Sequence, residues 1–353
     1  MKPIEQMPIS IKGFSLKLSD DASLTSSQRI ELISKKLPEL RKGQVLVKIL
    51  ASPVNPSDLV HLLGKYGLKA ESGLFVGFEA CGIVVHANAG FYGKYLVGKR
   101  VALSAQPGHD GLWAQYAITK ANYCLPVTDA ISDEQASTLI VNPCTSVCLV
   151  ERAIALGAKA IVLNAAASQV GKGVIRYATS KGISTIACIR NKQHAEQLIE
   201  LGATQVLVTG DENYQQILQD ACQKYQAKVL LDAVAAEDTA RSLKAMPNGS
   251  TAIIYGRLTE THDPFGGIFP VADVIFRDIK IEGFWLAKYI GDASIWQVYR
   301  LSQKVQRLFT SGVFKTDIHK VVDFKDFAQA LDHYANNKSD GKVILKPNAD
   351  EGR

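Results

Sequence analysis

The pattern of apolar and polar positions changes twice along the chain. Up to about residue 125, short apolar segments are separated by glycine and proline, which is typical of an antiparallel, barrel-like domain. From about Ser132 onward, strand-like and helix-like patterns alternate with short links, which predicts a doubly wound parallel sheet. The expected strands are Gln44–Ser52, Ala80–Ala87, Arg100–Leu103 and Trp113–Thr119 in the first part, and 160–164, 183–189, 205–208, 227–232 and 250–256 in the second.

The last part of the chain returns to the first pattern. A helix is expected from Ser294 to Thr310, followed by short strands at Val321–Phe324 and Lys342–Leu345. These strands are predicted to rejoin the β-rich domain. The resulting division is a β-rich domain at 1–130, an alternating α/β domain at 131–288, and a return to the first domain at 289–353.

Residues 161–175 carry the clearest functional signal. An apolar run is followed by small residues and then by an apolar-periodic segment, which predicts a strand, a tight turn and the start of a helix. Small side chains in such a turn let backbone N–H groups approach a pyrophosphate at the positive end of the helix dipole. The glycine fingerprint is degraded, because Ala165 and Ser168 occupy its first two positions and only Gly171 remains. A turn that serves packing alone is the alternative interpretation.

The next predicted strand ends in Arg190, Asn191 and Lys192. Sites selective for NAD usually carry an acidic residue there to hold the ribose 2′-hydroxyl, whereas basic residues suit a 2′-phosphate. The segment therefore predicts NADPH as the cofactor. Solvated surface charges are the alternative for Arg190 and Lys192.

Composition excludes several classes of protein. The chain has 353 residues, enough for two domains, with 47% apolar and 21% charged residues. No run approaches the ~18 apolar residues of a membrane-spanning helix. A net charge of +6 without a basic tract favours neither nucleic-acid nor membrane binding. The first residues lack a signal pattern and an Arg-rich presequence, so a cytoplasmic protein is expected. The six scattered cysteines are expected to be reduced.

Short motifs spread along nearly the whole chain carry a more specific resemblance. They resemble the zinc-independent branch of the medium-chain dehydrogenase/reductase superfamily, and within it most closely the 2-enoyl thioester reductases, the mitochondrial enoyl-CoA and enoyl-acyl-carrier-protein reductase family. The quinone oxidoreductase branch comes second. The motifs are NPSD at 55–58, GKYG at 64–67, GLW at 111–113, VNPCTS at 141–146, NAAASQVG at 164–171, IRNK at 189–192, IIYG at 253–256 and GFWL at 283–286.

The resemblance implies a GroES-like substrate domain, formed by both ends of the chain, around an inserted Rossmann domain. It also implies that no metal is used. Zinc-dependent relatives carry a cysteine at the position of Asn55 and a histidine at that of Phe78, and neither residue present here is a zinc ligand. Without a Lewis acid an alcohol lacks its usual means of losing a proton near neutral pH, so alcohol dehydrogenation is not expected.

The resemblance assigns two catalytic residues. Tyr66 in GKYG occupies the position of the family's catalytic tyrosine, and a phenol with a pKa near ~10 can donate a proton or hydrogen bond to a developing enolate. The alternative is a turn tyrosine that covers the edge of the domain. Trp285 in GFWL matches a tryptophan that helps to position the thioester, and a core tryptophan is its alternative.

The cofactor residues follow from the same resemblance. Lys342 matches a lysine near the cofactor phosphates, with a surface charge on an edge strand as its alternative. Arg257 departs from the family, which usually has glycine there, and would either obstruct a bulky acyl group or bind an acidic one. The full set comprises Asn142 and Thr145 near the nicotinamide, Ser168, Gln169, Val170 and Gly171 at the pyrophosphate, Arg190, Asn191 and Lys192 at the 2′-phosphate, Tyr255, Gly256, Arg257 and Leu258 at the nicotinamide end, Phe284, Trp285 and Leu286 from the linker, and Lys342.

The expected function is therefore the NADPH-dependent, metal-free reduction of a conjugated C=C bond in a 2-enoyl thioester of fatty acid metabolism. Its carrier is coenzyme A or acyl carrier protein. The first alternative is a quinone or enone oxidoreductase of the zeta-crystallin type, and the second is a non-catalytic, NADPH-binding regulatory protein. Relatives pair through the outer strand of the nucleotide-binding sheet, so a homodimer is expected through residues 270–284, taken as an edge strand.

Overall fold

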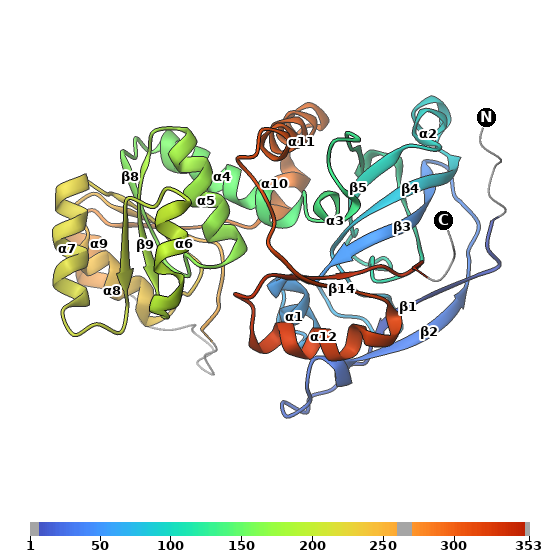
Figure 1. Ribbon diagram of the computed structural model, residues 1–353, viewed down its shortest axis with the longest axis horizontal. Coiled ribbons are helices and arrows are strands. Elements are labelled where there is room, and N and C mark those ends of the chain that lie inside the picture. The colour runs from blue at the N-terminus through green and yellow to red at the C-terminus, as the bar shows by residue number, and fades with distance from the viewer. Residues whose placement is uncertain (1–6, 260–269, 350–353) are drawn as a thin grey trace. The chain divides into compact units, whose positions relative to one another are not determined.

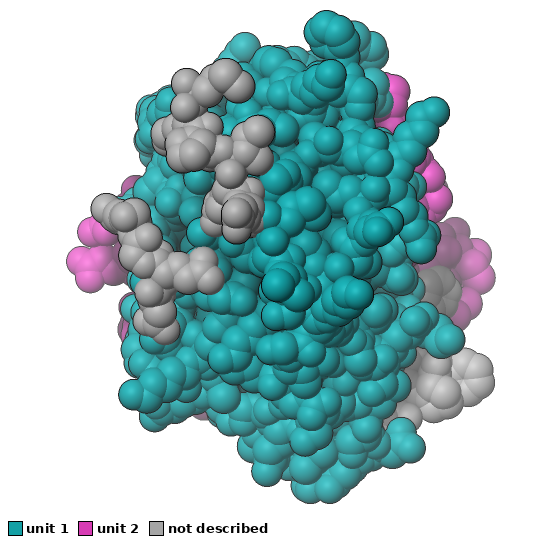
Figure 2. Space-filling model, turned by 90° about the vertical axis from the view of Figure 1, so that its right-hand side faces the viewer, with its two compact units in different colours: residues 1–141, 295–353 teal, residues 142–294 magenta. Residues whose placement is uncertain are grey.

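A computed structural model describes residues 7–259 and 270–349. The chain divides into two compact units, shown in different colours in Figure 2: unit 1 comprises residues 1–141 and 295–353, and unit 2 comprises residues 142–294. The predicted boundaries at 130/131 and 288/289 fall somewhat earlier in the chain. In the described part of the chain, no helix is both long enough and apolar enough to cross a membrane.

Unit 1 is built on a seven-stranded sheet. Its strand order is β14-β15-β3-β4-β5-β7, and β6 pairs with β3. A separate two-stranded sheet joins β1 to β2. The strands are β1 (Ser10–Leu16), β2 (Ile30–Lys36), β3 (Gln44–Pro53), β4 (Glu79–Asn88), β5 (Arg100–Ser104), β6 (Tyr116–Lys120), β7 (Cys124–Pro126), β14 (Ile318–Val322) and β15 (Lys342–Leu345), and the α-helices are α1 (Pro56–Leu62), α2 (Gly90–Leu96), α3 (Asp133–Ala136), α11 (Ile295–Thr310) and α12 (Phe324–Asn336).

Helix α12 shows why the C-terminal part of the chain returns to unit 1. Its N-cap residue Asp323 accepts hydrogen bonds from the backbone N–H groups of Lys325 and Asp326, at 2.8 and 3.2 Å. One face is apolar at helical spacing, and its buried members are Phe327, Ala330, Leu331 and Tyr334. This face joins the core cluster that contains Phe14 and Trp113, whose rings lie 4.9 and 4.8 Å from the ring of Phe327. Figure 1 shows α12 beside β14.

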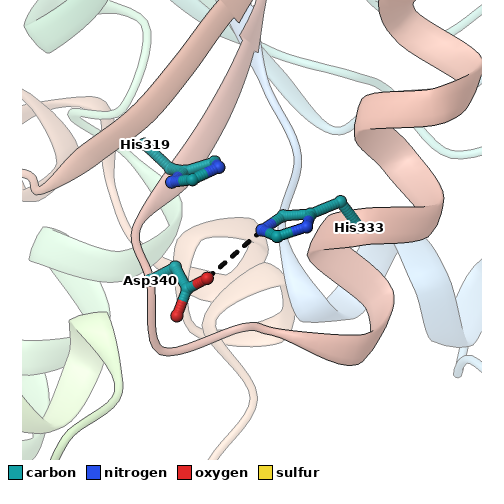
Figure 3. A group of neighbouring side chains, drawn as sticks. All are labelled: His319, His333 and Asp340. Atoms are coloured by element: carbon teal, nitrogen blue, oxygen red, sulfur yellow. Dashed lines mark hydrogen bonds and ion pairs between the residues drawn. The ribbon is translucent and has the colours of Figure 1, made fainter.

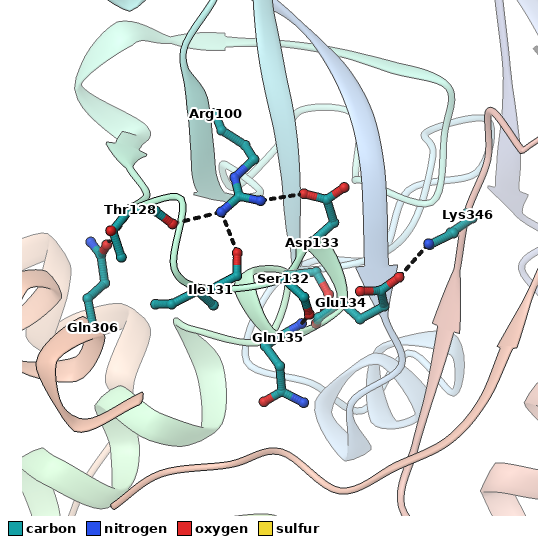
Figure 4. Close-up of polar contacts among 10 residues, drawn as sticks. Arg100, Thr128, Ile131, Ser132, Asp133, Glu134, Gln135, Gln306 and Lys346 are labelled. Carbon is teal, nitrogen blue, oxygen red and sulfur yellow. Dashed lines mark hydrogen bonds and ion pairs between the residues drawn. The ribbon is translucent and has the colours of Figure 1, made fainter. Parts of the chain in front are cut away.

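Polar contacts fasten residues 126–137 to the returning segment (Figure 4). Gln306 on α11 accepts from the backbone N–H of Thr128 at 3.0 Å and donates to the carbonyl of Pro126. Arg100 donates to Asp133 at 2.8 Å and to the carbonyls of Thr128 and Ile131. In the returning segment, Lys346 forms an ion pair with Glu134. The first and last parts of unit 1 are thus held together by both packing and polar contacts.

Unit 2 is a doubly wound α/β unit, as the alternating pattern predicted (Figure 1). Its six strands form one parallel sheet in the order β10-β9-β8-β11-β12-β13. The strands are β8 (Ala160–Leu163), β9 (Ser184–Ile189), β10 (Gln205–Val208), β11 (Val229–Asp232), β12 (Thr251–Ile254) and β13 (Lys280–Gly283), and the helices are α4 (Val141–Ala155), α5 (Gln169–Ser180), α6 (Ala195–Glu200), α7 (Tyr214–Tyr225), α8 (Glu237–Ala245), α9 (Val271–Phe276) and α10 (Leu286–Asp292).

Two expected elements are wrong in part. The strand expected at Val321–Phe324 is found at Ile318–Val322, because Asp323 caps α12 and Phe324 begins it. Residues 270–284 were taken as a single edge strand because of their β-branched content, yet residues 271–276 form α9 and only Lys280–Gly283 form β13. The apolar residues Val271, Val274 and Ile275 are spaced as on a helix face, and Val274 packs on the core of unit 2. The turn between the two elements passes through Asp278 at φ 51°.

The expected α/β class is confirmed, with a β-rich unit formed from both ends of the chain and a doubly wound unit between them. The cysteines are also as expected, since all six are free and buried. Buried thiols of this kind act as small apolar side chains.

Candidate functional site

The candidate nucleotide site of unit 2 lies at the carboxyl ends of its parallel strands. The strand order reverses between β8 and β11, and ligands of open α/β sheets bind at such a switch point. The candidate residues of unit 2 that follow strands come directly after the carboxyl ends of β8, β9, β12 and β13. The topology therefore brings segments distant in sequence to one edge of one sheet.

The turn after β8 has the geometry of a phosphate-binding loop despite its missing glycines. Ala165, at the first glycine position, adopts φ 47°, the left-handed conformation that glycine adopts most readily. Ser168 caps α5, and its Oγ accepts from the N–H of Gly171 at 3.1 Å. A Cβ on Gly171 would lie 2.5 Å from the carbonyl oxygen of Ala166, so the close approach of helix to turn requires glycine there.

The residues after β9 present basic side chains to solvent. Arg190 and Lys192 are exposed, and neither forms an ion pair with any residue that the structure describes. Asn191 plays a different part, because its Oδ1 accepts from the N–H of Gln193 at 3.0 Å and caps a short 3-10 helix. Arg190 and Lys192 are therefore the two cations of this segment available to a phosphate, while Asn191 shapes the turn that carries them.

A buried carboxylate that the sequence analysis missed organises the centre of this edge. Asp232, the last residue of β11, is fully buried and accepts from the side chain of Asn164 at 2.6 Å. Its carboxylate also accepts from the N–H groups of Val234 and Ala235, at 2.9 and 2.8 Å. An acidic residue that ends an apolar strand was the available signal. The network fixes the loop after β11 against the loop after β8.

The loop after β11 also contains strained backbone conformations. Ala235 and Ala236 follow Asp232 and adopt φ values of 65° and 53°. Non-glycine residues hold such conformations only where their surroundings impose them, and they cluster at ligand sites. Gly256 lies close to this loop, where a Cβ would come within 2.9 Å of the Ala233 carbonyl oxygen.

The nicotinamide-end candidates lie on the loops after β12 and β13. The backbone N–H of Tyr255 donates to the Asp232 carbonyl at 2.9 Å, and that of Leu258 to the Ala233 carbonyl at 3.0 Å. The backbone N–H of Phe284 donates to the carbonyl of Ile254 at 2.8 Å, which brings the two loops together. Arg257, Leu258 and Trp285 are exposed at these loops, whereas Gly256, Phe284 and Leu286 are half-buried.

The remaining candidates of unit 2 lie on α4 and at the start of α5. Asn142 and Thr145 are buried in the first turns of α4. Ser146 donates to the Asn142 carbonyl at 2.9 Å, and its Oγ lies 3.0 Å from the carbonyl oxygen of Val170. The same hydroxyl thus ties α4 to the first turn of α5, where Gln169 and Val170 are half-buried.

The residues of unit 2 fit a dinucleotide on two counts. The start of α5 packs closely on the turn after β8, because Gly171 has no Cβ to clash with the Ala166 backbone, and this is the role of the third glycine of a dinucleotide fingerprint. In addition, the Tyr255 hydroxyl is buried without a hydrogen-bond partner among the described residues, and burial raises the pKa of this phenol. A buried hydroxyl without a partner is costly, and a polar ligand group would remove that cost.

In unit 1, Tyr66 belongs to a small aromatic cluster. Its ring lies 5.0 Å from that of Phe78 and 6.4 Å from that of His61. The His61 Nδ1 is buried without a partner among the described residues, and burial lowers the pKa of the imidazole. Phe78, at the position of a zinc ligand in other relatives, is therefore an apolar wall beside the candidate catalytic phenol.

The second feature of unit 1 is a buried ionic network that the sequence analysis did not foresee. Lys342 is fully buried, and its Nζ donates to the Val54 carbonyl at 2.8 Å, to the Tyr334 hydroxyl at 3.3 Å and to the Asn55 side chain. Lys342 had been expected near the cofactor phosphates. These bonds commit its ammonium to the interior of unit 1, so we leave it out of the proposed cofactor set.

Two carboxylates complete the network. Asn55 donates to Glu79 Oε1 at 2.9 Å, and the other Glu79 oxygen accepts from the N–H groups of Ile140 and Val141. Asp58 accepts from the N–H groups of Asn55 and Phe78, at 2.7 and 3.0 Å. The network therefore joins α1, β4 and β15 to the segment that leads into α4.

Burial dominates the charge balance of this network. It raises the pKa of Asp58 to about 7 and also raises that of Glu79, against the effects of hydrogen bonds and Lys342. It lowers the pKa of Lys342 to about 8, although both carboxylates oppose this shift. One cation faces two carboxyl groups here, so the interior favours holding a proton on one of them.

Comparison with known proteins agrees with this fold. The chain matches two family models: the alcohol dehydrogenase GroES-like domain over residues 41–129 and the zinc-binding dehydrogenase over residues 170–304. The mitochondrial enoyl-[acyl-carrier-protein] reductase of Bos taurus is 30% identical over 321 residues, covering 90% of this chain and 84% of the relative. The Schizosaccharomyces pombe enzyme of the same name is 28% identical and covers 90% of both chains.

Solved structures give the same picture. A Mesorhizobium loti protein assigned as an NADPH:quinone reductase is 30% identical with a TM-score of 0.87, covering 97% of this chain and 99% of that one. The mitochondrial 2-enoyl thioester reductase heterodimer of Candida tropicalis has a TM-score of 0.79 over 96% of this chain and 100% of that one. At 19% identity it supports the fold alone.

Fold and site together define a dinucleotide-binding oxidoreductase with a GroES-like unit. The chain belongs to the medium-chain dehydrogenase/reductase superfamily and is similar to its enoyl thioester reductases. The expectation of a cytoplasmic protein is overturned by the relatives, which are mitochondrial by name. That expectation rested on the absence of a targeting pattern in the first residues, and such an absence is a weak indicator of compartment.

Replacing Lys342 by methionine tests the ionic network. The variant leaves Asp58 and Glu79 buried without their cation, which should lower the free energy of unfolding by about 3–5 kcal/mol. Urea unfolding followed by circular dichroism at pH 7 measures this loss. Lys17→Met, at an exposed lysine of the same unit, should change the unfolding free energy by less than about 0.5 kcal/mol. Equal losses in the two variants would contradict the network's role.

The same network predicts a pH dependence. The folded-state pKa of Asp58 is raised from 3.8 to about 7, so its contribution to stability falls as pH rises between those values. The folded-state pKa of Lys342 is lowered from 10.5 to about 8, so its contribution falls as pH drops through that window. The combined contribution should be lowest between pH 7 and 8. The free energy of unfolding is measured from pH 5 to 10. The Lys342→Met variant should lose the rise in stability above pH 8 and keep the fall in stability as pH rises toward 7.

Proposed function

We propose that this protein reduces the conjugated C=C bond of a 2-enoyl thioester with NADPH. The observation that carries the proposal is the edge of the unit 2 sheet, where the Gly171 turn and two exposed cations follow neighbouring strands. Neighbouring folds support the cofactor: one solved relative is named for NADPH, and one thioester reductase structure is a complex with NADP and crotonyl-CoA. The enoyl-reductase names of the curated relatives support the substrate class.

In this proposal each loop at the sheet edge has its own part in holding the cofactor. The turn from Ser168 to Gly171 receives the pyrophosphate at the start of α5, where N–H groups and the helix dipole favour an anion. Arg190 and Lys192 pair with the 2′-phosphate. The nicotinamide end is held by Asn142, Thr145, residues 255–258 and residues 284–286.

NADPH, when bound, supplies the hydride that reduces Cβ of the substrate. The charge that then develops on the thioester oxygen requires a hydrogen-bond donor, and the proton added at Cα requires an acid. We assign both tasks to the phenol of Tyr66. Phe78 and His61 pack against its ring and restrict its orientation. Trp285 positions the thioester. The carrier is coenzyme A or acyl carrier protein.

A second candidate function is the reduction of quinones or enones. The Mesorhizobium loti structure assigned to that activity is as similar in sequence as the bovine enoyl reductase, at 30% identity. A quinone accepts hydride without an acid at Cα, so this activity would not depend on the Tyr66 hydroxyl.

Replacing Tyr66 by phenylalanine distinguishes the two activities. With crotonyl-CoA and NADPH, kcat should fall by about 10²- to 10⁴-fold, because the general acid is lost. With a simple quinone the rate should stay within a factor of two or so of the parent. Tyr123→Phe, at another half-buried tyrosine of unit 1, is the matched control. An unchanged rate with crotonyl-CoA would refute the assigned role, and a parent protein silent with every acceptor would point to a non-catalytic, cofactor-binding protein.

Cofactor choice is tested at Arg190 and Lys192. Each alanine variant should raise KM for NADPH by about 10- to 100-fold, the cost of one lost hydrogen bond to a charged phosphate. KM for NADH should stay unchanged, because NADH has no 2′-phosphate. Lys228→Ala serves as control, since this exposed lysine precedes β11 and so lies at the opposite edge of the sheet. Parallel changes for both cofactors would show that the two side chains do not contact the 2′-phosphate.

We further propose that the protein is a homodimer paired along β13. This strand is the last of its sheet, and an unpaired strand edge favours association. The adjoining helix α9 exposes apolar side chains, with Ile275 64% and Phe276 81% accessible. Light scattering should give twice the chain mass of 38.3 kDa, and the double variant Ile275→Glu, Phe276→Glu should give the monomer. Phe91→Glu, at a residue 95% exposed in unit 1, should remain dimeric.

A further inference from the structure

Three potential metal ligands meet on the surface of unit 1, and none of them is a member of the candidate nucleotide site or of the aromatic cluster around Tyr66. His319 lies on β14, His333 on α12, and Asp340 on the turn that leads to β15 (Figure 3). One ligand atom of each side chain lies within 4.8 Å of the others, and all three residues are exposed. Among the residues that the structure describes, no other group of three or more such side chains meets this condition.

One distance within this group is already close to that around a tetrahedral ion, and the other ligand atoms lie within 4.8 Å. Ligand atoms bound at about 2.1 Å in a tetrahedron lie ~3.4 Å apart. His333 Nε2 and Asp340 Oδ2 are already 3.2 Å apart. The ring of His319 stacks on that of His333, with centroids 4.7 Å apart and planes 10° from parallel. In this stack the two rings do not point their nitrogens at one common position, so His319 would have to turn to share an ion with His333, and both rings are exposed to solvent.

The backbone is shaped to hold the three residues together. The pairing of β14 with β15 is irregular between Ile318 and Lys320, so His319 lies at a bulge, a feature that redirects a side chain. Gly341 adopts φ +124°, and a Cβ there would lie 2.9 Å from the backbone N of His319. The glycine therefore allows the chain to pass close to His319, which places Asp340 beside the imidazoles.

We propose that His319, His333 and Asp340 bind a divalent transition-metal ion of the zinc type. Two imidazole nitrogens and one carboxylate oxygen are ligands that suit zinc, cobalt and nickel better than magnesium or calcium. Three protein ligands leave the fourth position to water, and the exposure of the site admits it.

The ion would join β14, α12 and the turn before β15 at the surface of unit 1. In the interior, α12 and β15 are already joined by a hydrogen bond. His333 immediately precedes Tyr334, and Asp340 lies two residues before Lys342. Tyr334 and Lys342 are hydrogen-bonded members of the buried ionic network. A metal ion that binds only the folded chain stabilises it by mass action, so the site links metal occupancy to the stability of the segment returning to unit 1.

Calorimetric titration of the full chain, free of any affinity tag and treated with chelator, tests the proposal. ZnCl₂ should bind with one saturable equivalent. His319→Gln, His333→Gln and Asp340→Asn should each weaken this binding by at least about tenfold. His109→Gln, at an exposed histidine elsewhere in unit 1, should bind zinc like the parent. In the same titration MgCl₂ should give no saturable heat.

Two further measurements distinguish this site from adventitious binding. Excess zinc should raise the melting temperature of the parent and of His109→Gln but not that of the three ligand variants, which should melt like the parent when metal-free. Cobalt(II) should give the visible absorption of a tetrahedral site in the parent alone. Failure to saturate with zinc below ~1 mM, zinc binding retained in all three ligand variants, or equally strong magnesium binding would overturn the proposal.

Discussion

The buried ammonium of Lys342 is the interaction on which unit 1 depends. It arrives on the last strand of the sheet and bonds to Val54 and Asn55, nearly 290 positions earlier in the chain. A lysine in the interior is tolerated only with partners, and its partners here are held in turn by Glu79 and Asp58. The network requires a cation at position 342. An apolar residue there would fill the space, but it would leave two carboxyl groups without a cation. The return of the chain to unit 1 is therefore fixed by charge as well as by the apolar face of α12.

Unit 2 depends on a constraint of a different kind, the close approach of backbone to backbone at the carboxyl edge of its sheet. Glycine is used at Gly171 and Gly256, where a Cβ would meet carbonyl groups. Elsewhere alanine takes the conformations that glycine would adopt more easily, as at Ala165 and Ala235. These residues cost free energy in the folded state, and the Asp232 network holds the loop in which the strain lies. Strain and satisfied polar groups lie at the same edge, which is the arrangement of a preformed ligand site.

Local pattern was sufficient to predict most elements. The strands of unit 2 were placed to within a few residues because each is a short apolar run bounded by polar positions and followed by a helical pattern. The same criterion failed at 271–276, where β-branched residues occupy helix spacing and tertiary packing of Val274 decides the outcome. The burial of Lys342 could not be predicted from its own motif, because a lysine in an apolar strand gives no sign of whether it faces solvent or a carboxylate brought in by residues 55–79. Contacts of that sequence separation leave no local pattern.

The two positions that the resemblance matches to zinc ligands of other relatives hold side chains with structural contacts in this chain. Asn55 uses both ends of its amide: the oxygen accepts from Lys342 and the nitrogen donates to Glu79. Phe78 contributes its backbone N–H to Asp58 and its ring to the cluster around Tyr66. Restoring a cysteine at 55 would therefore remove two hydrogen bonds from a buried network before it offered a thiolate to any metal. Restoring a histidine at 78 would replace the apolar wall beside the phenol. The two substitutions are coupled to Lys342 and Tyr66 through direct contacts, so the metal-ligand positions and the candidate acid belong to one interdependent set of side chains.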